Sequence, residues 1–90
     1  MLEVVLSNRF KKDLKLAARR GCNFELLNEI VNKLASREPL PEKNKDHALS
    51  GDYSGFRECH IAPDWLLVYR TEDKDLILYL MRTGTHSDLF

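Results

Sequence analysis

The chain has 90 residues, of which 43% are hydrophobic and 31% are charged, and its formal net charge is zero. This length and composition indicate one small globular domain and exclude a disordered chain. No apolar run approaches the roughly 20 residues of a membrane-spanning helix, and we expect that the short, acidic N-terminus is not a signal peptide. The expected compartment is therefore the cytoplasm.

The first 40 residues predict one strand followed by two helices. Residues 2–6 read as a short strand because apolar side chains dominate and alternate. Apolar residues then recur at spacings of three and four from Phe10 to Ala18, and Gly21 ends this first helix. Asn23 caps a second amphipathic helix, which stops before Pro39. Because the segment between the two helices is so short, we expect them to form an antiparallel helical hairpin.

The second half predicts a polar loop over 39–53 and then three strands, at 56–61, 65–70 and 76–81. The expected fold is a small α+β domain with the order β-α-α-β-β-β. Its sheet is mostly antiparallel, and the helical hairpin packs on one face. The other face is expected to be free for a site.

Three histidines, two acids and an arginine lie in short polar segments of this second half. They are His47, Glu58, His60, Asp64, Arg82 and His86. Strand alternation places Glu58 and His60 on the same face, and Asp64 follows a bend that can return it to His60. We therefore expect these polar segments to lie close together at one edge of the sheet.

Such a set suits cleavage of an RNA phosphodiester. One histidine can accept the proton of the 2′-hydroxyl and another can protonate the 5′-oxygen that leaves. Arg82 can bind the phosphate through its guanidinium, and Glu58 and Asp64 can orient the imidazole rings. No metal or other cofactor is required, although His60, Asp64 and His86 could formally bind a metal ion.

A basic stretch runs from Arg9 to Arg20, with six basic residues and one acid, and it carries a net charge of +5. Its lysines Lys11, Lys12 and Lys15 can bind phosphates, or they can form an ordinary solvated helix face. The two cysteines, Cys22 and Cys59, lie in no metal-binding spacing and are expected to be free thiols.

Three segments in order carry a resemblance to a known family. They are Asp46–Gly51, Phe56–Tyr69 and Arg82–Phe90. In these segments, and over essentially its whole length, the chain resembles the YafQ branch of the RelE/ParE superfamily of toxins from bacterial toxin–antitoxin modules. The resemblance implies a RelE-like domain over residues 1–90. It also implies a ribosome-dependent mRNA endoribonuclease, an antitoxin partner, and a toxin–antitoxin complex that binds operator DNA.

The resemblance also implies that His47, His60, Asp64 and His86 form the site, with Arg82 and Phe90 contributing. Glu58 falls where this family often has a carboxylate. We assign proton transfer to His86 and His60, with Asp64 tuning His60 and His47 holding the phosphate. Two alternatives remain: a ParE-like toxin that binds and inhibits gyrase, and a chain with a degenerate site that serves its antitoxin in operator binding.

Overall fold

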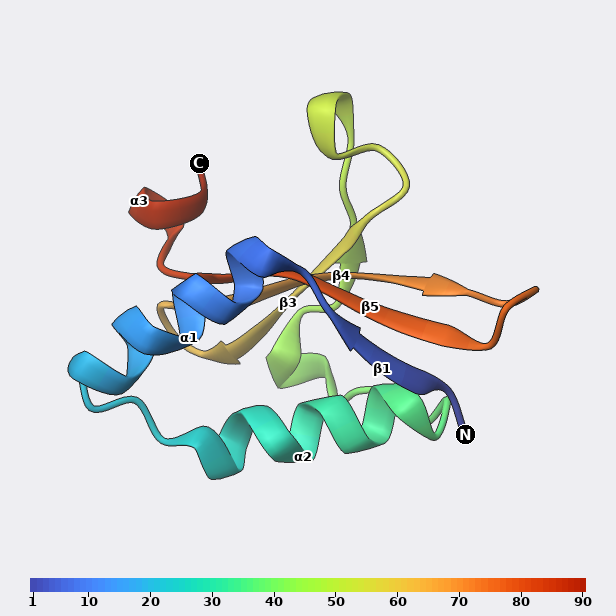
Figure 1. Ribbon diagram of the computed structural model, residues 1–90, viewed down its shortest axis with the longest axis horizontal. Coiled ribbons are helices and arrows are strands. Elements are labelled where there is room, and N and C mark those ends of the chain that lie inside the picture. Colours follow the sequence, from blue (N-terminus) through green and yellow to red (C-terminus); the bar gives the residue numbers. More distant parts are fainter.

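The computed structural model describes residues 1–90, which form a five-stranded sheet and three α-helices. The strands are β1 (Glu3–Leu6), β2 (His47–Ala48), β3 (Arg57–Ala62), β4 (Trp65–Glu72) and β5 (Ile77–Gly84). The helices are α1 (Asn8–Arg19), α2 (Phe24–Ala35) and α3 (His86–Leu89). In the sheet the order is β1-β5-β4-β3-β2, with β1 parallel to β5 and every other pair antiparallel (Figure 1). The predicted α+β class is confirmed, and the predicted elements occur in the predicted order, with β2 and α3 in addition.

Both long helices begin at a side-chain cap, and the cap of α2 is the predicted Asn23. The hydroxyl of Ser7 accepts a hydrogen bond from the amide of Phe10, and the side chain of Asn23 caps α2 in the same way. Between the helices, Gly21 has a φ of +75°, which a residue without a Cβ adopts readily. Ser7 also donates to the carbonyl oxygen of Met81 at 2.7 Å, and this bond ties the start of α1 to β5.

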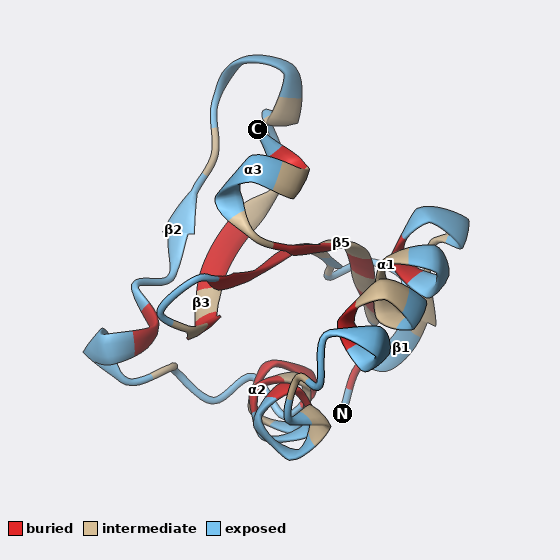
Figure 2. Ribbon diagram, turned by 90° about the vertical axis from the view of Figure 1, so that its left-hand side faces the viewer, coloured by how far each residue is buried: buried red, intermediate tan, exposed pale blue.

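Two apolar clusters lie on opposite faces of the sheet, because strand alternation sends neighbouring side chains of β4 in opposite directions. Leu67 and Tyr69 join the larger cluster, which packs under α1 and α2. Leu66 and Val68 pack instead with Leu89 of α3. Figure 2 shows α2 and α3 on opposite sides of the sheet. The second face, predicted to be free, is therefore partly covered by the C-terminal helix.

The predicted polar loop over 39–53 is more structured than its composition indicates. It contains two 3-10 turns, Glu42–Asn44 and Gly51–Tyr53, with β2 between them. β2 pairs with β3 so that His47 lies opposite Glu58. A strand of two residues is too short to show alternation, and for that reason the sequence pattern missed it.

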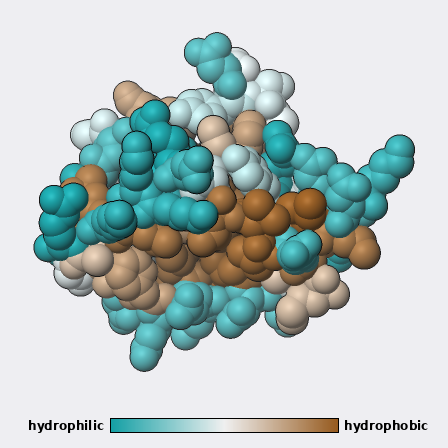
Figure 3. Space-filling view, in the orientation of Figure 1, coloured by the Kyte–Doolittle hydropathy of each residue, from teal (hydrophilic) through white to brown (hydrophobic).

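The face shown in Figure 3 carries an apolar band across its middle, with polar regions above and below it. An open depression between α1 and α2 is lined by Leu14, Ala18, Phe24 and Leu27. Each of these helices has 12 residues, and none in the chain is long and apolar enough to cross a membrane. The polar site lies on the other side of the sheet.

Candidate functional site

The three histidines and two acids converge beneath α3, on the sheet face opposite α1 and α2. β2 carries His47, and β3 carries Glu58 and His60 on one face of the strand. Asp64 lies in the turn between β3 and β4, and His86 is the first residue of α3. The convergence predicted for these five residues is thus present in the structure.

Glu58 lies at the centre of this group. Its side chain is 6% exposed, and its Oε1 atom lies 3.6 Å from Nε2 of His47 and 4.0 Å from Nε2 of His60. A buried carboxylate is costly unless positive charge or hydrogen-bond donors face it. The groups that face this buried carboxylate are therefore the Nε2 atoms of the two imidazole rings.

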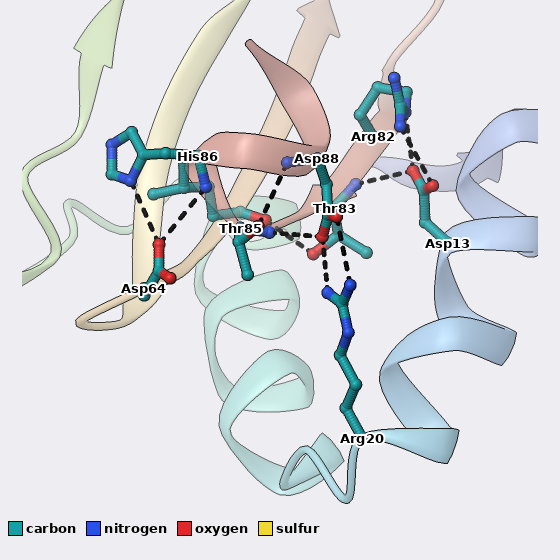
Figure 4. A network of polar contacts seen from close by, with 9 residues as sticks. Asp13, Arg20, Asp64, Arg82, Thr83, Thr85, His86 and Asp88 are labelled. Carbon is teal, nitrogen blue, oxygen red and sulfur yellow. Dashed lines mark hydrogen bonds and ion pairs between the residues drawn. The ribbon is translucent and has the colours of Figure 1, made fainter.

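His86 faces His60 across the site. Their ring centroids are 5.7 Å apart, with an interplanar angle of 65°. Oδ1 of Asp64 lies 3.3 Å from both the backbone nitrogen and Nδ1 of His86 (Figure 4). Asp64 was expected to tune His60, but in the structure its carboxylate contacts His86, the first residue of the C-terminal helix. A proton on Nδ1 of His86 is held by Asp64, and Nε2 is left free.

His47 is held by its own loop. Its Nδ1 atom lies 2.7 Å from the carbonyl oxygen of Lys45, which can only accept, so Nδ1 carries the proton and Nε2 has a free lone pair. The neighbouring Asp46 accepts hydrogen bonds from the hydroxyl of Tyr69 at 2.5 Å and from Nε of Arg57 at 3.2 Å. Burial, with Asp46 adding to it, raises the pKa of Tyr69 well above its usual value, so this phenol remains a donor.

A separate network holds α3, which carries His86. The hydroxyl of Thr85 accepts from the amide of Asp88, and the carboxylate of Asp88 accepts from the amide of Thr85, forming a capping box. Arg20, at the end of α1, donates to both oxygens of Asp88, at 2.6 and 3.2 Å (Figure 4). These bonds, with that from Arg20 the largest cause, hold the pKa of Asp88 far below its usual range. A Cβ at Gly84 would lie 2.8 Å from Oδ2 of Asp88, so glycine is needed there.

Arg82 does not join the histidines, contrary to the prediction. Its guanidinium donates to the two carboxylate oxygens of Asp13 on α1, at 2.8 and 3.3 Å, and both side chains are nearly buried. The backbone amide of Thr83 donates to the same carboxylate at 3.1 Å. The bond to Asp13 raises the pKa of Arg82, which stays charged. In this structure Arg82 links β5 to α1, and its guanidinium is occupied by Asp13 rather than turned toward the histidines.

The predicted substrate-binding residues lie around the site rather than in it. Phe90 is 59% exposed and stacks edge-on against Tyr53 with centroids 5.5 Å apart. Lys11, Lys12 and Lys15 are all exposed on α1, which covers the other face of the sheet. The side chains of these residues make no hydrogen bond with the histidine rings, although the amide of Phe90 donates to the carbonyl oxygen of His86 at 2.8 Å.

Several residues near the site were not found by sequence reasoning. An open groove of about 480 Å³ borders His60 and is also lined by Lys43, Asn44 and Lys45. The side-chain amide of Asn44 donates to the carbonyl oxygen of His60 at 2.7 Å and so supports that residue. The signal for the C-terminal helix was available, since Thr85 and Asp88 have the spacing of a capping box. No local pattern pointed to Arg20 or Asp13, whose partners are distant in sequence.

One group of side chains could hold a metal ion. Glu58, His60 and His86 each offer a ligand atom, and these atoms lie within 4.8 Å of one another. This set differs from the alternative raised from the sequence, in which Asp64 took the place of Glu58. Cys59 takes no part, because burial raises the pKa of its thiol to about 12. Both cysteines are free thiols, as predicted.

Known proteins resemble this chain over nearly its whole length. Residues 2–90 match the family described as the bacterial toxin of type II toxin–antitoxin systems, YafQ. The mRNA interferase toxin YafQ of Escherichia coli K12 is 39% identical over 89 residues, which cover 98% of this chain and 95% of that protein. The crystal structure of a metal-bound toxin from Helicobacter pylori is 46% identical, with a TM-score of 0.94 and all of both chains covered. A chain in the E. coli DinJ–YafQ complex is 37% identical, with a TM-score of 0.89 and coverage of 100% and 99%.

Proposed function

Because this chain belongs to the YafQ family of toxins from bacterial type II toxin–antitoxin systems, we propose that it is an mRNA interferase that cleaves mRNA on the ribosome. The observation that carries the proposal is the convergence of His47, His60 and His86 on the buried carboxylate of Glu58. A protein that acts only by binding has no need of three titratable rings around one buried charge.

The proposed reaction uses the RNA itself as nucleophile. One imidazole accepts the proton of the 2′-hydroxyl, whose oxygen then forms a bond to the adjacent phosphorus. The bond from phosphorus to the 5′-oxygen breaks, and a second imidazole donates the proton that the leaving oxygen requires. The products are a 2′,3′-cyclic phosphate and a 5′-hydroxyl. His60 and His86, whose rings face each other, are the proposed pair.

The remaining residues have supporting roles in this proposal. Asp64 orients the ring of His86, since the carboxylate lies beside Nδ1. His47, with its tautomer set by the carbonyl of Lys45, contacts the phosphate. Glu58 stabilises positive charge on the rings as it develops. Arg82 acts through the position of β5 and α3 rather than as a phosphate ligand.

The substrate path follows from the charges and the open surface. We propose that the groove beside His60 takes the mRNA backbone against Lys43 and Lys45, and that the exposed ring of Phe90 stacks on a base. The lysines of α1 would contact ribosomal RNA at a distance from the site. An antitoxin would neutralise the toxin, and the complex would bind operator DNA. The DinJ–YafQ complex of E. coli provides the example of a toxin–antitoxin pair.

We assign no catalytic role to a metal ion. The H. pylori toxin was crystallised in a metal-bound form, and the candidate ligands in this chain include His60 and His86. These are the groups proposed to transfer protons, and a nitrogen bound to a metal has no lone pair left to accept one. The histidines therefore supply the proton transfers without a metal.

The test is a reconstituted translation reaction with a defined mRNA, followed by primer extension to locate new ends. We expect cleavage of ribosome-bound mRNA by the wild-type protein and little cleavage of the same mRNA without ribosomes. The gyrase alternative is tested in parallel with a DNA supercoiling assay. Inhibition of supercoiling together with intact mRNA would contradict the proposal and favour a ParE-like toxin.

A further inference from the structure

We propose that Glu58, His60 and His86 form a binding site for a divalent transition-metal ion such as Zn²⁺, and that occupation of the site switches mRNA cleavage off. Binding follows from the geometry of the three side chains. Inhibition rests in addition on the proposed function, because it requires the same histidines to transfer protons.

The three ligand atoms are close to the spacing that zinc requires. They lie within 4.8 Å of one another, whereas donors at tetrahedral zinc distances are about 3.4 Å apart. Glu58 and His60 are fixed by β3, and both are largely buried. His86 has a side chain that is 58% exposed, so its ring can move the last ångström toward the other two without disturbing the core.

The electrostatics of the site favour a cation at this point. Glu58 is a buried carboxylate whose ion-pairing contacts are two histidine nitrogens at 3.6 and 4.0 Å. When these rings are neutral, no positive charge faces the carboxylate. A divalent ion would neutralise it and would use lone pairs that otherwise have no partner. His47, whose Nε2 atom lies 3.6 Å from the same oxygen, is placed to supply a fourth ligand.

Contacts to Nδ1 of His86 and of His47 determine which ring nitrogen is free to bind a metal. Asp64 lies beside Nδ1 of His86, and the carbonyl of Lys45 accepts from Nδ1 of His47. Both contacts leave Nε2 as the free ligand, in the carboxylate–histidine–metal and carbonyl–histidine–metal arrangements of known sites. Two imidazoles and one carboxylate suit Zn²⁺, whereas Mg²⁺ prefers oxygen ligands and water. The magnesium that ribosomes need should therefore not compete for this site.

Zinc at this position would stop cleavage directly. The Zn–N bonds use the lone pairs that would accept the proton of the 2′-hydroxyl, and a metallated ring carries no transferable proton on that nitrogen. The ion would also lie between His60 and His86, where the scissile phosphate is proposed to bind.

Binding is tested by calorimetric titration of untagged, metal-free protein with ZnCl₂. We expect one equivalent to bind, no binding of Mg²⁺, and an affinity at least tenfold lower in Glu58→Gln and in His86→Gln. Asp64→Asn, which removes only the outer partner of His86, should lower the affinity by roughly 10- to 100-fold. Cys22→Ser is the control, because it removes the more exposed thiol and should bind zinc as the wild type does. Unchanged affinity in both Glu58→Gln and His86→Gln would overturn the site.

Inhibition is tested with protein loaded with zinc and freed of excess metal by gel filtration. In the ribosome assay, the zinc-loaded wild type should cleave at least tenfold more slowly than the metal-free protein, and a zinc-selective chelator should restore the rate. Equal or faster cleavage by the loaded protein would overturn the switch. If metal-free protein fails to cleave, the proposed function and the inhibition fall together, while the calorimetric titration still decides the metal site.

Discussion

Glu58 is the residue on which the proposed chemistry depends, because three rings from β2, β3 and α3 approach its buried carboxylate. Strand alternation alone predicts that Glu58 and His60 share a face, and the structure places them so. The position of His86 could not be derived in this way, since it depends on how the last residues fold back over β3. Two contacts between residues far apart in the chain hold the last residues in this position. Arg20 donates to Asp88, and Asp64 accepts from the backbone amide of His86.

Replacement of His60 or His86 tests the proton-transfer pair. His60→Ala and His86→Ala should each lower single-turnover cleavage on ribosomes by on the order of 10²-fold or more, as loss of a general acid or base does. His86 is exposed and His60 is partly buried, so His60→Gln is added to keep the packing. Circular dichroism should report a folded protein in every case. Wild-type rates in both alanine variants would rule this pair out.

Asp13 supports the site from outside it, through its nearly buried ion pair with Arg82. Asp13→Asn leaves the guanidinium without its partner and should lower the free energy of unfolding by about 2–3 kcal/mol, measured by urea denaturation. The matched control is Asp73→Asn, which breaks an exposed pair with Arg37 and should change stability by less than about 0.5 kcal/mol. Similar losses in the two variants would contradict a structural role for the buried pair.

At the scale of the element, α3 is a short helix that stays in place through its capping box and its ion pair with α1. Four residues are too few for a helix that is stable by itself. The helix packs Leu89 on the sheet and presents His86 and Phe90. Its position is therefore sensitive to the charge on Asp88.

The lowered pKa of Asp88 predicts how stability depends on pH. Its folded-state value lies below the usual value of about 4, so its contribution is full above pH 4 and is lost as the pH falls toward the folded value. The drop in unfolding free energy between pH 6 and pH 2.5 should be smaller in Asp88→Asn than in the wild type. Asp75→Asn, at an exposed turn residue, should leave the drop unchanged. An identical drop in Asp88→Asn would show that the pair with Arg20 has no role in acid stability.

At the scale of the whole molecule, the order of the main helices and strands and the face that bears the site follow from sequence periodicity. Helix stripes and strand alternation are local signals, and they identify α1, α2, β3, β4 and β5. Three features were not predictable in this way: β2, the partial cover over the second face, and the pairing of Arg82 with Asp13. β2 has only two residues and is too short to show alternation, and the other two features depend on interactions between residues far apart in the chain, which no short window of sequence contains.

The charge of the whole molecule is zero, yet α1 carries an exposed basic stretch. Replacing Lys11, Lys12 and Lys15 by glutamine should weaken ribosome binding and flatten its dependence on salt. The slope of log K against log salt should become shallower by roughly 0.7–0.9 for each phosphate that the variant no longer neutralises. Cleavage at saturating ribosomes should change much less. Lys74→Gln, in an exposed turn, is the control. An unchanged slope in the triple variant would indicate that the basic stretch is an ordinary solvated helix face with no role in ribosome binding.

The chemistry of the new RNA ends tests the central claim most directly. An mRNA with a single 2′-deoxynucleotide on the 5′ side of the mapped scissile phosphate is compared with the all-ribose mRNA on ribosomes. Attack by the 2′-hydroxyl predicts that the ribose substrate yields a 2′,3′-cyclic phosphate and a 5′-hydroxyl, and that the deoxy substrate is not cut at that position. A 5′-phosphate on the downstream fragment, or equal cleavage of the two substrates, would contradict histidine-catalysed attack by the RNA's own hydroxyl.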